Sequence, residues 1–244
     1  MEAYGPATYG DRIADVYDQH VVDLGLDTEG AVETLASLAG AGPVLELAIG
    51  TGRLALPLAE RGFEVYGIDA SEAMVAKLRE KPGGDRIPVT MGDFADVGVD
   101  GTYSLILVAF NTFFGLSSQE HQVQCFANVA THLADRGVFL IEVFLPDLGR
   151  FDRGQRTQVT QLNPDEVFLD ASRHDPVAQV IESNHVVITE AGTKLYPVNL
   201  RYAFPGELDL MARLAGLELK ERWGDWNRQP FTASSPRHVS VYGR

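Results

Sequence analysis

The sequence predicts an α/β protein with a doubly wound, mostly parallel β-sheet, and three observations support this prediction. First, short apolar segments at 44–48, 63–68, 87–91, 103–110 and 138–144 have the length and composition of buried strands. Second, helical patterns separate several of these strands, which is typical of right-handed βαβ units with helices on both faces of a sheet. Third, residues 157–204 show little helical periodicity and contain turn-forming pairs such as Asn163-Pro164, which indicates an antiparallel insertion.

The composition is that of an ordinary globular protein. Of the 244 residues, 45% are hydrophobic and 22% are charged, and 20 Lys and Arg against 34 Asp and Glu give a formal net charge of −14. This length allows one large domain to bury a sufficient core without disulfides or metals. The negative charge argues against a nucleic-acid partner, because phosphate contacts supply most of the affinity in such complexes.

Cysteine content and the length of the apolar segments indicate the compartment. Cys125 is the only cysteine, which excludes an internal disulfide and a cysteine-rich zinc site and fits a reducing compartment. The most apolar stretches, at 105–110 and 138–145, fall far short of the roughly 18 residues that a membrane span requires. No positively charged start followed by an apolar run opens the chain. The sequence therefore predicts a cytoplasmic protein without a membrane partner, and a homodimer is compatible with it.

Residues 1–40 predict a helical cap. Tyr4, Tyr9 and Tyr17 lie in a polar and aromatic start, and apolar residues at helical spacing from Ile13 to Leu24 indicate a short helix. A second helix is expected over 32–38, and the sequence Gly-Ala-Gly-Pro at 40–43 ends it.

The predicted sheet begins at residue 44. Its first strand leads through Gly50-Thr51-Gly52 into a helical pattern that Gly62 ends. A second strand follows, and Ser71 is a suitable N-cap for a helix through about residue 81. The series continues with strands at 87–91 and 103–110, an amphipathic helix at 119–134 and a strand at 138–144.

After residue 146 the pattern changes. Segments 177–189 and 194–204 have the composition of antiparallel strands around the Ala191-Gly192 turn. Pro205 suits the start of a helix through about Ala215, and strands at 217–223 and 238–242 return the chain to the main sheet. We therefore expect three parts: the cap at 1–40, the main domain at 41–148 and 205–244, and the insertion at 149–204.

The strongest local motif lies where the first strand turns into a helix. Two glycines, Gly50 and Gly52, let a ligand approach the backbone, and the helix N-terminus offers free N–H groups and a positive dipole end. Residues 50–55 also satisfy the dinucleotide pattern G-x-G-x-x-G/A, so a nicotinamide- or flavin-dependent enzyme has to be weighed. Asp69 ends the next strand, 19 residues after Gly50, where it would face a ribose diol with both of its oxygens.

Two further positions separate the candidate ligands. Glu46 lies inside an apolar strand, where a carboxylate is costly unless it is hydrogen-bonded, and a dinucleotide turn has no use for it. Asp93 and Phe94 follow the third strand, where a carboxylate can accept from an exocyclic amine and an aromatic ring can lie against a purine. Three acidic positions on successive strands indicate an adenosine ligand without a pyrophosphate.

In these residues the chain resembles the class I S-adenosylmethionine (SAM)-dependent methyltransferases, over roughly residues 40–145. The resemblance implies a Rossmann-like, doubly wound sheet of seven strands, with SAM as the cofactor and S-adenosylhomocysteine (SAH) as the product. In this family the glycine turn lies near the methionine part of SAM and the acidic residue after the second strand binds the ribose. The resemblance implies cofactor contacts at Tyr17, Glu46, Gly50, Gly52, Arg53, Asp69, Ala70, Met74, Asp93, Phe94 and Ala109.

The rest of the chain is similar to a narrower group of small-molecule methyltransferases, which includes the amino-sugar N-methyltransferases of natural-product pathways. In that group an antiparallel insertion after the fifth strand forms part of the substrate site. The resemblance implies substrate contacts at Asn111, Glu142, Arg201 and Arg237, and it makes Glu142 and His238 the candidates for catalytic residues.

Some of these residues also have ordinary structural explanations. Tyr17 is as well suited to the core as to a cofactor site, and Arg201 could pair with Glu207 or Asp209 on the following helix. The amino-sugar enzymes carry a histidine in the loop after strand four, where this chain has Gly115, and this departure argues against a sugar-amine substrate. The histidines show no metal-ligand spacing, so we expect no metal.

Together with the resemblance, the residues predict an enzyme that transfers a methyl group from SAM to a nitrogen or oxygen of a small molecule by in-line displacement. A dedicated base is optional, because a neutral amine can attack unaided whereas an alcohol must lose a proton. One alternative is a SAM-binding protein without methyl transfer, acting as a scaffold, a regulator or the catalyst of a non-redox rearrangement. The other is an NAD-dependent oxidoreductase, which would be expected to carry a catalytic Tyr-x-x-x-Lys pair that we do not find.

Overall fold

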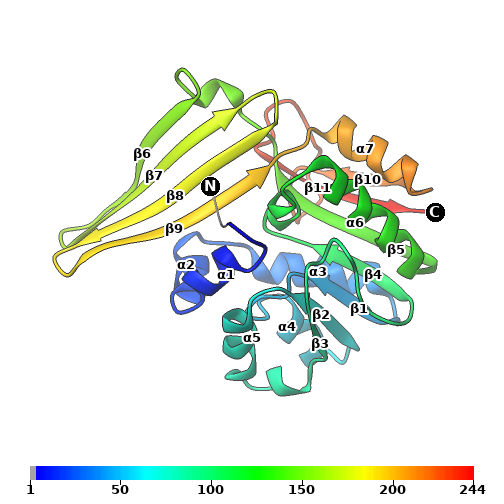
Figure 1. The fold of residues 1–244 in the computed structure, drawn as a ribbon. Helices are drawn as coiled ribbons and strands as arrows, with labels where there is room; N and C mark the ends of the chain where they lie inside the picture. Colours follow the sequence, from blue (N-terminus) through cyan, green and yellow to red (C-terminus); the bar gives the residue numbers. More distant parts are fainter. Residues whose placement is uncertain (1–3) are drawn as a thin grey trace.

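The computed structural model describes residues 4–244, and its main sheet has seven strands (Figure 1). β11 runs antiparallel to both of its neighbours, whereas the pairs β5/β4, β4/β1, β1/β2 and β2/β3 are parallel. The doubly wound, seven-stranded sheet that the sequence predicts is thus confirmed. In spatial order the strands are β10 (Glu218–Trp223), β11 (Arg237–Gly243), β5 (Leu133–Phe144), β4 (Tyr103–Val108), β1 (Val44–Leu47), β2 (Val65–Asp69) and β3 (Val89–Met91).

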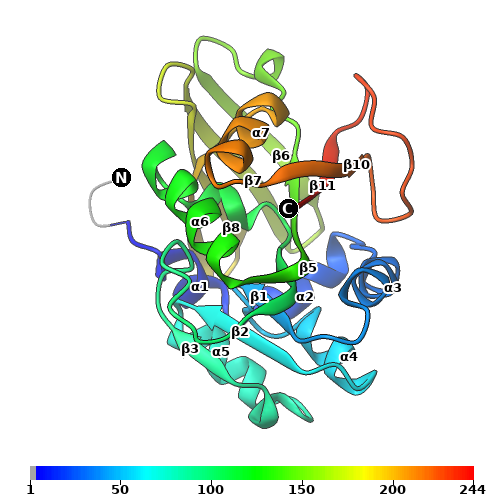
Figure 2. The same ribbon diagram turned by 90° about the vertical axis from the view of Figure 1, so that its right-hand side faces the viewer.

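Helices cover both faces of this sheet (Figures 1 and 2). One face carries α3 (Thr28–Ala39), α4 (Ala55–Glu60) and α5 (Glu72–Arg79), and the other carries α6 (Gln119–His132) and α7 (Pro205–Leu214). Local sequence explains where they begin: Ser71 Oγ caps α5 by accepting from Met74 N–H at 3.2 Å, and Pro205 opens α7. Across residues 4–244, none of the helices combines the length and apolarity that a membrane crossing requires.

Two apolar layers hold the helices on the sheet. Phe126 of α6 is fully buried and meets Phe139 of β5 edge-to-face, with ring centroids 5.3 Å apart. On the opposite face Leu58 of α4 is buried with Leu105 of β4. Because β4 is covered on both sides, its residues from Leu105 to Val108 form a continuous apolar run instead of alternating with polar ones.

A second, four-stranded antiparallel sheet lies between β5 and α7 in the sequence, and it projects from the main body with β9 nearest to it (Figure 1). The expected pairing of the last two strands is confirmed. The sequence does not delimit the first two, because the first is polar and exposed along most of its length. Its strands are β6 (Gln155–Leu162), β7 (Glu166–Asp175), β8 (Val180–Thr189) and β9 (Gly192–Arg201).

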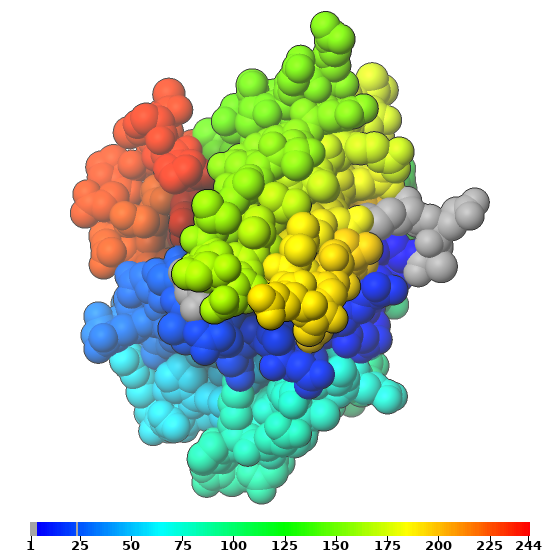
Figure 3. Space-filling model, turned by 90° about the vertical axis from the view of Figure 1, so that its left-hand side faces the viewer, coloured from blue at the N-terminus to red at the C-terminus, as the bar shows by residue number. Residues whose placement is uncertain are grey.

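The cap begins with two short helices, α1 (Thr8–Ile13) and α2 (Tyr17–Asp23), where the sequence predicts one. In Figure 3 this blue segment lies between the main domain and the green-to-yellow insertion sheet. α1 contacts β9 of the insertion and α5 of the main domain. The cap therefore connects the two sheets beside the carboxyl ends of the parallel strands.

Candidate cofactor and active site

The carboxyl ends of β1, β2 and β4 meet where the order of the strands reverses, which is the position at which open α/β sheets bind ligands. Gly50 and Gly52 follow β1, Asp69 ends β2 and Ala109 follows β4. Gly50 N–H donates to Asp69 Oδ2 at 2.7 Å, so the glycine turn and the end of β2 are joined directly. The structure thus brings together cofactor residues that the sequence predicts from separate segments.

The two glycines are required by the conformation of the turn. Gly50 has φ +57° and Gly52 has φ +82°, both in the left-handed region. A Cβ at Gly52 would also collide with Leu78 Cδ1, and one at Gly50 would lie 3.3 Å from Met74 Cε. The turn therefore depends on glycine both for its backbone and for the close approach of α5.

Asp69 holds two loops together and keeps acceptor capacity for a ligand. In addition to Gly50, it accepts a hydrogen bond from Ser71 N–H to Oδ1 at 2.8 Å. Burial raises the pKa of Asp69, and the backbone N–H groups of Ser71, Gly50 and Ala70 lower it. An ionised carboxylate offers about four lone-pair sites, so the vicinal hydroxyls of a ribose fit the positions that remain.

Glu46 carries a buried oxygen without a partner. Its side chain is 6% exposed, and Oε2 has no hydrogen-bond partner among residues 4–244. Burial raises the pKa of Glu46 to about 8, while Arg53 and the Ala55 N–H act to lower it. A cationic ligand group would relieve the cost of this unpaired oxygen, and the methionine ammonium of SAM fits it.

Arg53, in the turn before α4, and Tyr17 of the cap face the same region. The Arg53 guanidinium lies 5.8 Å from the centre of the Phe110 ring and donates to Thr28 Oγ1 at 3.4 Å. Burial raises the pKa of Tyr17 to about 12, with Arg53 opposing this shift and Glu46 adding to it. The hydroxyl of Tyr17 therefore lies within electrostatic range of both charged groups at the glycine turn.

Carboxylates of the cap bind the loops that the sequence assigns to the cofactor. Asp18 accepts from Thr51 Oγ1 at 2.6 Å and pairs with Lys81 Nζ at 2.7 Å, and Lys81 Nζ also donates to Thr51 O at 2.8 Å. Asp11 accepts from Ser71 Oγ at 2.6 Å. We call the contacts among Asp18, Thr51 and Lys81 the cap clasp. Sequence reasoning missed it, because its members lie far apart along the chain.

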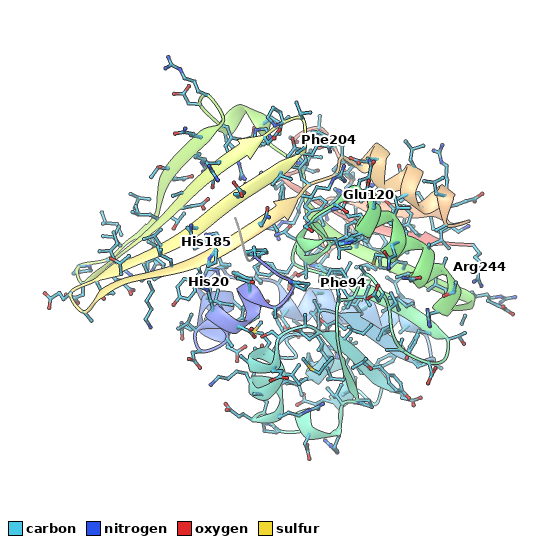
Figure 4. All side chains as sticks on the ribbon, in the orientation of Figure 1. His20, Phe94, Glu120, His185, Phe204 and Arg244 are labelled. Atoms are coloured by element: carbon cyan, nitrogen blue, oxygen red, sulfur yellow. The ribbon has the colours of Figure 1, made fainter. Side chains whose placement is uncertain are left out.

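The end of β3 carries the pair that the sequence assigns to the adenine. Asp93 Oδ1 accepts from Ala95 N–H at 2.9 Å, and the half-buried Phe94, labelled in Figure 4, packs against the core. Cys125 of α6 donates from Sγ to Phe94 O at 3.8 Å. Cys125 is buried, which confirms the prediction of a buried thiol. Burial raises the pKa of Cys125, so the thiol stays protonated.

Three of the predicted substrate residues lie together at the ends of β4, β5 and β11. Glu142 Oε2 accepts from Phe110 N–H at 2.9 Å, and Asn111 Oδ1 accepts from Phe144 N–H at 2.7 Å. Arg237 Nη1 lies 3.7 Å from Glu142 Oε1. Asn111, Glu142 and Arg237 therefore form one polar cluster next to Ala109.

The fourth predicted substrate residue, Arg201, is buried among protein partners. Its guanidinium donates to Gln122 Oε1 and to Glu207 Oε1, both at 2.6 Å. The pairing with Glu207 is one of the structural alternatives that the sequence offers, and a contact with substrate stays a prediction.

The second catalytic candidate, His238, is fully buried on β11. Its Nδ1 is 2.8 Å from Ser240 Oγ, and Nε2 has no partner within the described chain. Burial, and then Arg222, lowers the pKa of His238 to about 4, which keeps the ring neutral at pH 7. Its catalytic role also stays a prediction.

The fold assembles a histidine–carboxylate pair that sequence spacing does not reveal. Asp170 on β7 and His185 on β8 are opposite each other in the antiparallel register, with His185 Nδ1 3.6 Å from Asp170 Oδ1. The ring of His20 on α2 is 6.4 Å from that of His185, and Figure 4 labels both. In the part of the chain that the structure describes, no group of three or more His, Cys, Asp or Glu could hold a metal ion.

The sheet order, the glycine turn and the carboxylates at the strand ends define an α/β domain that binds an adenosine cofactor. Comparison with known proteins specifies the family. A family model described as "Methyltransferase domain" matches residues 44–137. The CcbJ methyltransferase from Streptomyces caelestis is 44% identical, with a TM-score of 0.92 over 98% of each chain. The chain belongs to the class I SAM-dependent methyltransferases.

Two further relatives agree with this assignment. The cypemycin N-terminal methyltransferase of a Streptomyces species is 28% identical over 98% of each chain. The sugar N-methyltransferase KedS8 from Streptoalloteichus sp ATCC 53650 is 21% identical, with a TM-score of 0.67 over 99% of this chain and 98% of that one, and it shares the fold. The protein is therefore an enzyme that uses SAM and releases SAH, and the comparisons give no support to the NAD-dependent or non-catalytic alternatives.

Proposed function

We propose that the enzyme methylates a nitrogen or oxygen of a small molecule and that nitrogen is the preferred acceptor. The observation that carries this proposal is that the carboxyl ends of the parallel strands lie beside both the cap and the insertion sheet, since α1 contacts α5 and β9, and β9 contacts the short 3-10 helix after β4. Such a site suits a small acceptor better than a folded macromolecule. The name of the sugar N-methyltransferase KedS8 specifies methylation at nitrogen, and that of the cypemycin N-terminal methyltransferase specifies a chain terminus, where a peptide carries an amine.

SAM supplies a methyl group carried on a positively charged sulfur. Because the charge disappears during in-line displacement, the protein has to align the acceptor with the methyl group and exclude water. In our proposal the open lone pairs of Asp69 bind the ribose, and the unpaired oxygen of Glu46 binds the methionine ammonium. The cap clasp then holds Tyr17 over the same region.

The other cofactor contacts follow from the placement of the remaining residues. We assign the turn at Gly50 and Gly52 to the methionine part of SAM, with Arg53 near its carboxylate. The adenine would lie beside Met74 or Ala70, within reach of the residues after β3. Asp93 and Phe94 are both partly exposed there, as a group that contacts a ligand must be.

On the acceptor side we propose that residues 149–204 form a lid and residues 1–40 a cap. Strand β9 contacts α1 and the short 3-10 helix Thr112–Gly115 that follows β4. Tyr4 of the cap accepts a hydrogen bond from the backbone of Asn199 on β9. Asn111 and Arg237 then contact the acceptor from the main domain, and Arg201 does so if its buried contacts rearrange.

The proposal is tested by mass spectrometry after incubation with SAM and matched panels of primary amines, secondary amines and alcohols. We expect methylated products from amines, and release of SAH that depends on the acceptor. Transfer only to protein or nucleic-acid substrates in parallel assays would overturn the proposal. An Asp69→Ala variant that retains full activity would overturn the assignment of the cofactor site.

We also propose that a second copy of the chain binds the outer face of the insertion sheet. Val159, Leu169, Val186 and Leu195 are in register across β6, β7, β8 and β9, and they form one aliphatic row. Val159 is 51% exposed and Leu195 is 49% exposed, so pairing of two such faces would bury the row. Light scattering should show a dimer that Val186→Lys dissociates, and a monomeric wild-type protein would refute the proposal.

We also propose that the protein is cytoplasmic, as the sequence predicts. This location is supported by Cys125, whose thiol is buried and free.

A further inference from the structure

Strand β4 ends in a corner of unusual backbone conformation. Phe110 has φ +55° and Asn111 has φ +66°, so two consecutive residues other than glycine lie in the left-handed region. Asparagine tolerates this region, but the bulky Phe110 does so only where surrounding contacts hold it. Strain of this kind persists when the structure around it is over-determined, and it concentrates at functional sites.

Hydrogen bonds to and from β5 hold the corner in place. Phe110 N–H donates to Glu142 Oε2 at 2.9 Å, and Asn111 N–H donates to the backbone oxygen of Glu142 at 3.0 Å. In the reverse direction, Phe144 N–H donates to Asn111 Oδ1 at 2.7 Å. Glu142 therefore provides two of these three acceptors, one from its side chain and one from its backbone.

Both carboxylate oxygens of Glu142 already face a donor. Oε2 is bonded to Phe110 N–H, Oε1 lies 3.7 Å from Arg237 Nη1, and the side chain is only 6% exposed. A further proton on this side chain would compete with one of these two donors for its oxygen, since neither oxygen is unoccupied. The arrangement is that of a hydrogen-bond acceptor for the backbone, and it does not suit a group that takes a proton in each turnover.

The corner lies at the centre of the proposed site. It directly follows Ala109, at the end of β4 where the strand order reverses. The Phe110 ring is 5.8 Å from the Arg53 guanidinium, which in turn acts on the pKa of Glu46. Moving the backbone of Phe110 would therefore shift a wall shared by the cofactor and acceptor regions.

We infer that Glu142 is a positioning residue for methyl transfer, which holds the left-handed corner at Phe110 and Asn111 through the Phe110 N–H. This inference rests on the proposed function of the same site. Glu142 takes no proton from the acceptor. Its carboxylate fixes the backbone that aligns the acceptor with the methyl group.

Two substitutions separate a positioning residue from a base. In Glu142→Gln the amide oxygen still accepts from Phe110 N–H, so we expect kcat within about threefold of wild type and an unchanged pH profile. In Glu142→Ala the corner is released, and we expect kcat to fall by roughly a hundredfold, because misplacement by about 1 Å can have that effect. Because the Phe110 ring also lies beside Arg53, the affinity for SAH should fall too, but by much less than kcat, since a loss of alignment is seen in kcat.

A general base would behave differently. Glu142→Gln would then lose as much activity as Glu142→Ala, and the acidic limb of the kcat profile would disappear in both variants. That result would overturn the inference. Glu218→Ala, which removes an exposed carboxylate from β10, is the matched control and should retain wild-type kinetics.

Hydrogen exchange provides a readout that does not depend on activity. The Phe110 amide should be protected in wild type and Glu142→Gln and should exchange at least about tenfold faster in Glu142→Ala. Equal protection of the Phe110 amide in all three proteins would overturn the inference. Faster exchange counts in its favour only if amides elsewhere in the sheet, such as that of Leu45 on β1, stay protected in Glu142→Ala, because unfolding would expose both. If the wild-type enzyme methylated no small molecule, the proposed function would be refuted, but the exchange rate of the Phe110 amide could still be measured in all three proteins. A failure of the proposed function and a failure of this inference are therefore distinguishable.

Discussion

Glu46→Gln is the substitution that the structure makes most informative for cofactor binding. Burial raises the pKa of Glu46 to about 8, so the free protein carries this carboxyl mostly protonated at pH 7. A bound ammonium group favours the ionised form, and binding should therefore release a proton below pH 8. One pKa unit corresponds to about 1.36 kcal/mol, so the association constant for SAH should rise by up to about tenfold per pH unit between about pH 6 and 7.5.

The loss in affinity can be estimated from the contact that Glu46 would make. A hydrogen bond to a charged group contributes about 1.5–3 kcal/mol, so Glu46→Gln should weaken SAH binding by roughly ten- to a hundredfold at neutral pH. Titration calorimetry in buffers of different ionisation enthalpy measures both the affinity and the proton release. Wild type should release a proton and the variant should not. Equal affinity, or equal proton release, in the two proteins would refute the assignment of Glu46 to the ammonium group.

Other contacts lead to further expected outcomes. Asp18→Asn should loosen the cap clasp and accelerate SAH release several-fold in stopped-flow experiments. The control Asp15→Asn alters only a surface pair with Lys77 and should leave the release rate unchanged. Equal release rates for the two variants would show that the clasp does not retain the product. Phe126→Ala should lower the free energy of unfolding by about 3–5 kcal/mol in urea titrations, and a loss below about 1 kcal/mol would contradict the packing described here. The cofactor-free protein should lose stability as the pH rises from 4.5 to about 8, because Glu46 ionises in the unfolded chain but stays protonated in the folded one. Glu46→Gln should flatten this pH dependence in thermal melts. An unchanged slope in the variant would contradict the raised pKa of Glu46.

The elements that the sequence predicts are those with strong local signals. Helix α5 follows from Ser71 as a cap and from apolar spacing, and the structure confirms both. Strand β4 follows from the uninterrupted apolar run at 105–110. By contrast, residues 4–27 contain two helices where apolar spacing predicts one, and the polar strand β6 could not be delimited, because neither segment has a clear periodicity that sets its ends.

The glycine turn and the acidic strand ends could be predicted because each feature lies within one short segment. Contacts between segments could not. Phe110 and Glu142 are 32 residues apart and Thr51 and Asp18 are 33 apart, so only the folded sheet and the docked cap bring them together. The pair of Asp170 and His185 depends on the β-hairpin register, which spacing along the chain does not determine.

The cofactor site is also where sequence reasoning explains least about mechanism. The sequence indicates that Glu46 and Glu142 are both unusual, since each is an acidic residue within an apolar strand. Only the structure separates them, because Glu142 has a backbone donor whereas an oxygen of Glu46 has no partner within the described residues. Burial alone therefore could not decide which carboxylate is hydrogen-bonded by the protein and which has an oxygen left to bind a ligand.

The most direct test of the account is a calorimetric titration of wild type and Asp69→Ala with SAH and, separately, with NAD. If Asp69 and the glycine turn form a SAM site, wild type should bind one SAH per chain and no NAD, and Asp69→Ala should lose most of the SAH affinity. Binding of NAD by wild type, or SAH binding that Asp69→Ala leaves unchanged, would contradict the central claim.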